Sequence, residues 1–101
     1  MTKSNDELIE AYDQSDAKVS EAATNLSAEA KRLGVTAKDA DQSAFKMAVR
    51  ARDDAESAIL DNLRRSGMRG SLLKRAFAAL ISGRSSAAGR YFRLARGIRG
   101  D

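Results

Sequence analysis

Apolar residues recur along the first third of the chain at alternating spacings of four and three. The seam consists of Leu8, Tyr12, Ser15, Val19, Ala22, Leu26, Glu29 and Leu33. Such spacing puts one side chain per turn on the same helix face and is close to a coiled-coil heptad, although two polar residues interrupt it. The pattern predicts a long amphipathic helix from about Asp6 to Leu33. Ser4 or Asn5 is expected to cap it, and Gly34 to end it.

A second apolar stripe predicts a helix from Thr36 to about Ser66, ended by Gly67. The stripe consists of Phe45, Ala48, Val49, Ala55, Ile59 and Leu63, and Arg52 intrudes on it. Thr36 and Asp39 have the spacing of a capping box at the start of this helix. Because consecutive helices joined by a short loop usually pack antiparallel, we expect residues 1–66 to form a long helical hairpin.

Glycine divides the last third of the chain, where six of the seven glycines lie at or after residue 67. After a connector over residues 67–70, a third helix is predicted to begin at Ser71 and to end at Gly83. One apolar face is expected on it, made of Leu72, Leu73, Ala76, Phe77, Leu80 and Ile81. A fourth helix is predicted from about Ser86 to Arg96. The expected fold is all-α: a hairpin in residues 1–66 and one or two short helices in an arginine-rich segment, residues 67–101.

Composition indicates a thin core. Nineteen residues are alanine, which favours helix but buries little surface, and proline is absent. We therefore expect a homo-oligomer, a dimer or a tetramer, with the first helix as its coiled-coil interface.

The residue types exclude several classes of function. Without cysteine or histidine the chain has no disulfides, no thiolate metal sites and no cysteine- or serine-histidine catalysis. We expect a protein that is not an enzyme and needs no cofactor. No run of 18 apolar residues is present and the N-terminus lacks the apolar segment of a signal peptide, so we expect a cytoplasmic protein.

Charge changes this picture most. Residues 1–63 carry 8 Lys/Arg and 13 Asp/Glu, a net charge of −5, whereas residues 64–101 carry 10 Lys/Arg and 1 Asp/Glu, a net charge of +9. A basic segment of this density is typical of contact with a polyanion. Guanidinium groups grip phosphates and stay charged at every physiological pH. The candidate residues for phosphate contact in this segment are Arg84, Arg90, Arg93, Arg96 and Arg99.

Other interpretations of the basic segment stay open. Its arginines would instead pair with acidic residues of the first two helices, leaving an ordinary solvated helix. Residues 70–81 also form a basic amphipathic pattern of the kind that lies on membrane surfaces, although the same pattern is more often a core-facing helix. We do not expect membrane binding.

A second basic patch lies inside the acidic region. Lys46 and Arg50 are one turn apart on one helix face, and Arg52 points elsewhere. Asp53 and Asp54 follow Arg50 at the spacing of ordinary helix-surface pairs, which is the alternative to DNA contact.

Three short segments resemble the GapR-like family of small helical nucleoid-associated DNA-binding proteins, which has relatives in phages. They are Ala28-Glu29-Ala30-Lys31 with Gly34 and Lys38, then Phe45-Lys46-Met47-Ala48-Val49-Arg50-Ala51-Arg52, then Ala58-Ile59-Leu60-Asp61. The order is preserved and the resemblance covers roughly residues 8–63. It implies that the first helix mediates oligomerisation and that the protein surrounds duplex DNA. It also implies phosphate contacts by Lys31, Lys38, Lys46, Arg50 and Arg52.

Together these observations predict a DNA-binding, DNA-architectural protein that contacts the backbone with little base-specific readout. The main alternative is a small helical adaptor, inhibitor or packaging protein, such as one encoded by a phage, whose basic C-terminus docks on an acidic protein partner.

Overall fold

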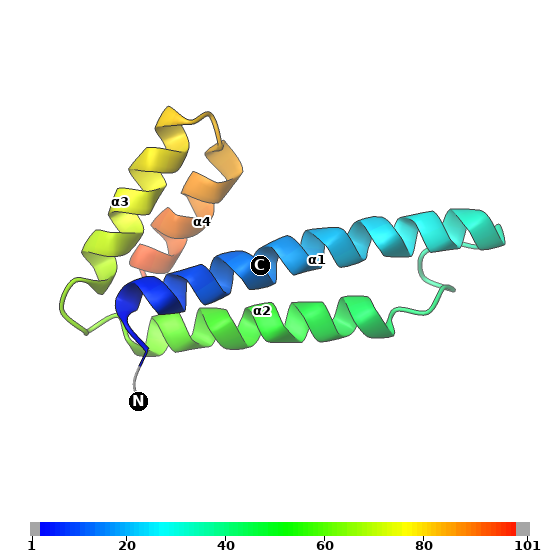
Figure 1. Cartoon of the computed structure of the whole chain (residues 1–101), viewed down its shortest axis with the longest axis horizontal. Coiled ribbons are helices and arrows are strands. Elements are labelled where there is room, and N and C mark those ends of the chain that lie inside the picture. The colour runs from blue at the N-terminus through cyan, green and yellow to red at the C-terminus, as the bar shows by residue number, and fades with distance from the viewer. Residues whose placement is uncertain (1–2, 99–101) are drawn as a thin grey trace. The chain divides into compact units, whose positions relative to one another are not determined.

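The computed structural model describes residues 3–98, and in that range it contains four α-helices and no strand (Figure 1). They are α1 (Asn5–Leu33), α2 (Ser43–Asp61), α3 (Met68–Ile81) and α4 (Ser85–Ala95). The all-α fold class is confirmed. The bounds of α1 and α4 lie within a residue of the predicted ones, whereas α2 begins later and ends earlier than predicted, and α3 begins earlier.

The N-terminus of α1 is fixed by a reciprocal pair of hydrogen bonds. The Glu7 amide donates to the Ser4 hydroxyl (3.1 Å), and the Ser4 amide donates to the Glu7 carboxylate (3.3 Å). This is a capping box, and it satisfies two backbone donors that a helix start leaves without partners. At the other end Gly34 has φ 71°, and the Val35 amide bonds to the Ala30 carbonyl (3.0 Å). The predicted stop at Gly34 is therefore confirmed, as a Schellman motif.

Substitution of the capping serine is expected to loosen the start of α1. In Ser4→Ala the Glu7 amide loses its acceptor, which typically costs about 1 kcal/mol of unfolding free energy. Urea unfolding followed by circular dichroism would measure the loss. Ser27→Ala, at an exposed position in the middle of α1, is the matched control and should be neutral or slightly stabilising. An unchanged unfolding free energy for Ser4→Ala would contradict the role of the box.

Helix α2 begins at Ser43, seven residues later than the capping-box spacing predicts. Thr36 does accept amide bonds from Asp39 (3.0 Å) and Ala40 (3.2 Å), but its hydroxyl donates to the Asp39 carboxylate instead of capping an amide. The turn ends there. Asp41 makes the cap actually used, because its carboxylate accepts from both the amide (3.0 Å) and the hydroxyl (2.6 Å) of Ser43.

Helix α3 begins at Met68, three residues before the predicted N-cap Ser71. Gly67, expected to end the second helix, has φ 85° and lies directly before α3, since α2 already ends at Asp61. Residues 62–67 form turns between the two helices. The physical reason is burial: Met68 is fully buried, and a helix that starts there places it on the same face as Leu72.

The described residues group into two compact units, and each helix of the α1–α2 pair contributes to both. Unit 1 comprises the described residues of Met1–Glu10 and Glu56–Asp101, and unit 2 is Ala11–Ala55. These bounds do not coincide with the predicted division at residue 66. The assignment of separate roles to residues 1–66 and 67–101 stays a prediction.

Unit 1 has a core of closely packed helices. Helices α3 and α4 pack on each other, joined by a tight turn at Gly83 (Figure 1). The fully buried large side chains here are Ile9, Ile59, Met68, Leu72 and Leu94. The Asn5 side-chain amide donates to the Ser66 carbonyl (2.8 Å), which ties the start of α1 to the turn before α3.

Unit 2 consists of the remainder of α1, the loop 34–42 and most of α2, and the two helices pack together. Tyr12 and Val19 of the predicted seam are buried. Towards the loop the seam opens: Ala22 and Leu26 are only half-buried, and Leu33 is 53% exposed. The apolar packing of the seam between α1 and α2 is therefore less complete towards the loop 34–42.

Candidate nucleic-acid interface

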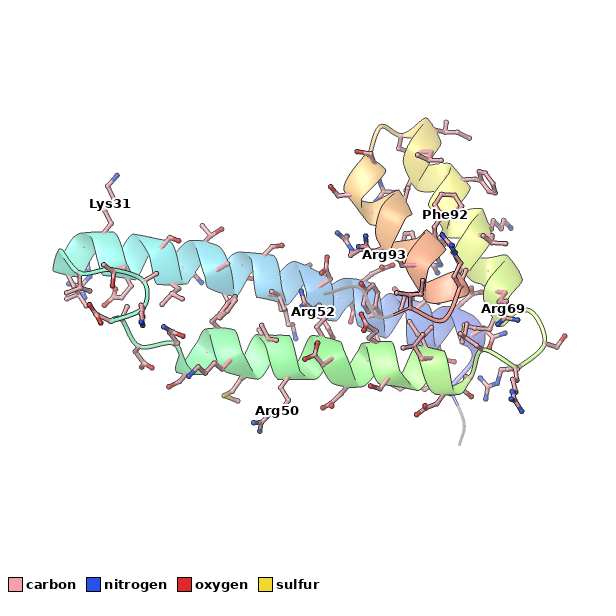
Figure 2. All side chains as sticks on the ribbon, turned by 180° about the vertical axis from the view of Figure 1, so that it is seen from behind. Lys31, Arg50, Arg52, Arg69, Phe92 and Arg93 are labelled. Carbon is pink, nitrogen blue, oxygen red and sulfur yellow. The ribbon has the colours of Figure 1, made fainter. Side chains whose placement is uncertain are left out.

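The arginines of α4 follow from the way this helix is packed. Its buried residues are Ala88, Tyr91, Leu94 and Ala95, which define the inward face. At 100° per residue Arg93 falls almost opposite that face, and Arg90 and Arg96 flank it on either side. Arg93 and Arg96 are exposed and Arg90 is half-buried. Figure 2 shows Arg93 projecting from α4 away from α3. The three arginines form a stripe that turns across the outer face of α4, as their spacing predicts.

Arg84 continues this basic surface at the N-terminal end of α4. It is exposed and lies in the cap position directly after the left-handed Gly83. Its backbone amide donates a hydrogen bond to the Ala79 carbonyl (2.8 Å), and its side chain is exposed to solvent. Arg99 lies outside the described residues.

The two aromatic residues of α4 have different roles. Tyr91 is 7% exposed and anchors the helix in unit 1. Phe92 is half-buried and packs edge-to-face on Phe77 of α3, with ring centroids 5.4 Å apart. Tyr91 therefore holds α4 against the core of unit 1, and Phe92 joins α4 to α3.

The segment that contains α3 and α4 is strongly positive because it has no acidic residues. Residues 62–98 contain nine Lys/Arg and no Asp/Glu. Three of these cations are engaged inside unit 1: Arg75 lies 3.8 Å from the Asp6 carboxylate, Arg65 donates to the Lys3 carbonyl (2.6 Å), and Arg69 donates to the Ala95 carbonyl (3.0 Å). These contacts hold elements of unit 1 together, so Arg65, Arg69 and Arg75 are structural cations.

Of the other six cations of this segment, Arg90 is half-buried and five lie on the surface of unit 1. Arg64, Lys74, Arg84, Arg93 and Arg96 are all exposed, and no ion pair is found for them among residues 3–98. Arg64 and Lys74 were not among the residues assigned from sequence. The signal that would have found them is the acid-free run itself, because cations there have few anionic neighbours along the chain.

The basic residues implied by the family resemblance do not gather on one surface of unit 2. Lys31, Lys38, Lys46 and Arg50 are exposed. In Figure 2 Lys31 points outward from α1 and Arg50 points outward from α2, on opposite sides of the helix pair. One straight duplex lying against a single copy of unit 2 would not meet both.

Arg52 has a different environment from its neighbours on α2. It is half-buried, and its guanidinium lies 3.8 Å from Asp16 of α1 and 4.0 Å from Asp53. Half-buried ion pairs of this kind bridge packed helices. Its intrusion on the apolar stripe is thus explained by pairing across the α1–α2 contact. A phosphate contact by Arg52 stays a prediction, and it would compete with this bridge.

The described residues bear on two other kinds of site, a metal site and a membrane span. Among them no group of three or more acidic side chains is placed to hold a metal ion. No helix in this part of the chain is long and apolar enough to span a membrane. Comparison of the chain with models of known protein families, with curated proteins and with solved structures finds no match.

Proposed function

We propose that the chain is a non-enzymatic DNA-binding protein that contacts the phosphates of duplex DNA and has little base-specific readout. The observation that carries the proposal is the arginine stripe on the outer face of α4, within a segment that has no acidic residue. Fixed cations on a helix surface match the even negative charge of a duplex backbone. They carry no information on base sequence, which is why low specificity is part of the proposal.

The rest of the proposal assigns roles to the acidic part of the chain. Helices α1 and α2 are proposed to form an antiparallel hairpin, and α1 to provide the interface of a homo-oligomer. Unit 2 has a net charge of −1, from 7 Lys/Arg and 8 Asp/Glu in residues 11–55. It therefore adds little attraction for DNA on its own. The phosphate contacts of Lys31, Lys38, Lys46, Arg50 and Arg52 belong to this proposal as a second surface, supported by the resemblance.

The proposal is tested by titrating the full-length protein against a random-sequence duplex at 50 and 200 mM salt, followed by fluorescence anisotropy. About five phosphate contacts give a slope of roughly −4.5 in log affinity against log salt, which corresponds to a loss of about 500-fold between the two conditions. Duplexes of unrelated sequence should bind alike. The full chain is needed because Ile9 and Ile59 are buried in the same unit as α3 and α4, so truncation would disturb the fold. Absence of binding at 50 mM salt would refute the proposal.

An adaptor that docks on an acidic protein is the second candidate function. One observation favours it: Phe77 and Ile81 of α3 are 57% and 88% exposed, and phosphates do not cover apolar side chains. If the chain fails to bind DNA at low salt, this alternative becomes the leading one.

A further inference from the structure

Helix α3 has two apolar faces, and within residues 3–98 one of them is buried and the other is largely exposed. The inward face consists of Met68, Leu72, Ala76 and Ala79, all fully buried. The second face consists of Leu73, Phe77, Leu80 and Ile81, with exposed fractions from 39% to 88%. We call this second face the α3 face. Its members are spaced four, three and one apart, so they lie together on one side of the helix.

The α3 face is a contiguous apolar patch and not a single exposed apolar residue of the kind common on protein surfaces. Phe92 of α4 extends it, because its ring packs on Phe77. A helix that is apolar on nearly all sides is normally buried, and contiguous exposed apolar patches usually mark a docking surface. The sequence predicted a single face through Leu72, Leu73, Ala76, Phe77, Leu80 and Ile81. The structure divides that set between core and surface, and the surface part lacks a cover.

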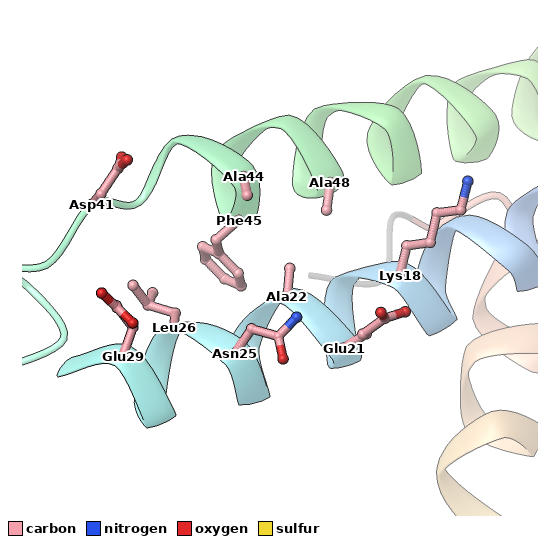
Figure 3. Close-up of a pocket in the computed structure, with 10 residues that line it drawn as sticks. All are labelled: Lys18, Glu21, Ala22, Asn25, Leu26, Glu29, Asp41, Ala44, Phe45 and Ala48. Atoms are coloured by element: carbon pink, nitrogen blue, oxygen red, sulfur yellow. The ribbon is translucent and has the colours of Figure 1, made fainter. Parts of the chain in front are cut away.

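Unit 2 has an apolar surface of its own that lacks a cover. A groove of about 430 Å³ lies between α1 and α2 near the loop. Its apolar lining includes Ala22, Leu26 and Phe45, whose side chains point into the space between the helices in Figure 3. Three residues of the predicted seam, Ala22, Leu26 and Glu29, are among those that line it. The half-buried part of the seam is thus the floor of an open groove.

The edge of the groove is acidic. Glu21, Glu29 and Asp41 stand around it with one cation, Lys18 (Figure 3). Hydrogen bonds from Ser43 lower the pKa of Asp41, and a hydrogen bond and ion pair with Arg32 lower the pKa of Glu29. Both carboxylates therefore stay ionised well into the acidic range. Because Arg32 compensates Glu29 and Lys18 offsets one further carboxylate, the edge of the groove keeps an excess of one negative charge.

The charge around the α3 face has the opposite sign. Lys74 borders it, three residues before Phe77 and seven before Ile81, and Arg84 follows the end of the helix. No acidic residue occurs between residues 62 and 98. A two-fold contact of one α3 face with another would therefore bring Lys74 and Arg84 of the two copies together, and the carboxylate that lies beside this part of α3, Asp6, is already paired with Arg75. Contact with the groove instead joins apolar to apolar and cation to carboxylate.

We propose that the α3 face of one copy docks in the groove of unit 2 of a second copy. The contact is heterologous: the two partners use different surfaces, so one copy keeps a free groove and the other a free α3 face, for more copies or for closure into a ring. The contact area is small, so the association is weak, with a dissociation constant on the order of micromolar. This contact rests on the proposed homo-oligomer and extends it, because it names the α3 face of a second copy as the surface that lies against α1. The contact itself does not depend on DNA.

The association is measured by sedimentation velocity on the full-length protein without DNA, from about 1 to 500 µM. We expect the wild-type protein to associate with rising concentration. Ile81→Glu removes the α3 face at a position that is almost fully exposed, and Ala44→Arg fills the edge of the groove with a bulky cation. Each variant alone should weaken association at least tenfold. Met47→Glu is the matched control, because Met47 is 73% exposed on α2 but does not line the groove; it should associate like the wild type.

Mixing the two variants separates this contact from every symmetric one. Ile81→Glu keeps an intact groove and Ala44→Arg keeps an intact α3 face, so an equimolar mixture should form one-to-one complexes that neither variant forms alone. Circular dichroism melting of each variant verifies that it is folded. A protein that is monomeric throughout, a mixture that fails to associate, or an equal effect of Met47→Glu would overturn the proposal. Recruitment of the α3 face to anionic vesicles without self-association would overturn it as well. DNA binding is titrated separately, so either proposal can fail while the other stands.

Discussion

Replacing Arg84, Arg93 and Arg96 together by glutamine will weaken binding to duplex DNA by roughly 100- to 1000-fold at 50 mM salt. Each phosphate contact contributes about 0.9 to the slope of log affinity against log salt, so the slope should decrease in magnitude by about 2.7. All three side chains are exposed, and within residues 3–98 no hydrogen bond or ion pair that holds unit 1 together involves their guanidinium groups. The loss should therefore come from the DNA contact and not from unfolding. Anisotropy titrations at several salt concentrations give both numbers.

A matched control is available in unit 2. Lys31, Lys38 and Lys46 are exposed, and their replacement by glutamine removes the same three charges from the chain. If the stripe on α4 is the main contact, this second variant should keep a slope within about one unit of the wild-type value. A loss as large as that of the arginine variant would place the interface on unit 2, as the family resemblance implies. If neither variant changes the affinity, neither surface binds DNA.

Replacing Leu94 by alanine will destabilise the protein by about 3 kcal/mol. Leu94 is fully buried in α4, so the change removes apolar contacts and leaves a cavity. Chains of this size have total stabilities of only about 5–15 kcal/mol, so the loss is a large share of the whole. Urea unfolding followed by circular dichroism measures it. The melting temperature should fall in parallel.

Leu80→Ala is the control for this change. It deletes the same atoms from a side chain that is 48% exposed on the α3 face. At concentrations where the protein is monomeric, its cost should stay below about 1 kcal/mol, because little area leaves contact with other residues. Equal destabilisation by the two variants would mean that the α3 face is covered within a single chain, contrary to the exposed fractions found here.

Helix ends show how much of this fold local sequence determines. Gly34 and Gly83 were expected to end two helices, and the fourth helix was expected to end near Arg96. Gly34, Gly83 and Gly97 each have a positive φ where these helices stop. That outcome depends on residues within one or two turns, which is why it could be read from the sequence. The first turn of α2 could not. Thr36 and Asp39 have the right spacing, but Asp41 provides the cap through two bonds to Ser43. Where two possible helix caps lie a few residues apart, packing against other elements decides which of them forms.

The sequence predicted the positive charge of the candidate site but not the partner of each basic side chain. The arginine spacing in α4 predicted a stripe, and the packing of Tyr91 and Leu94 turns that stripe outward. A phosphate contact by Arg52 stays a prediction, and the structure places its guanidinium beside Asp16 of α1. Two residues 36 positions apart in the sequence cannot be recognised as partners from local spacing.

The sequence by itself determined the helical fold class, three of the helix stops and the accumulation of positive charge after residue 63. These properties follow from backbone preference and from composition, and neither depends on what packs where. Only the tertiary structure decided which apolar residues of α3 are core and which are surface. Met68, Leu72, Ala76 and Ala79 meet the rest of unit 1, whereas the α3 face stays largely exposed, although its Phe77 packs on Phe92. A helix that is apolar over most of its circumference offers several equivalent faces, and the choice among them is made by the neighbours that the fold supplies.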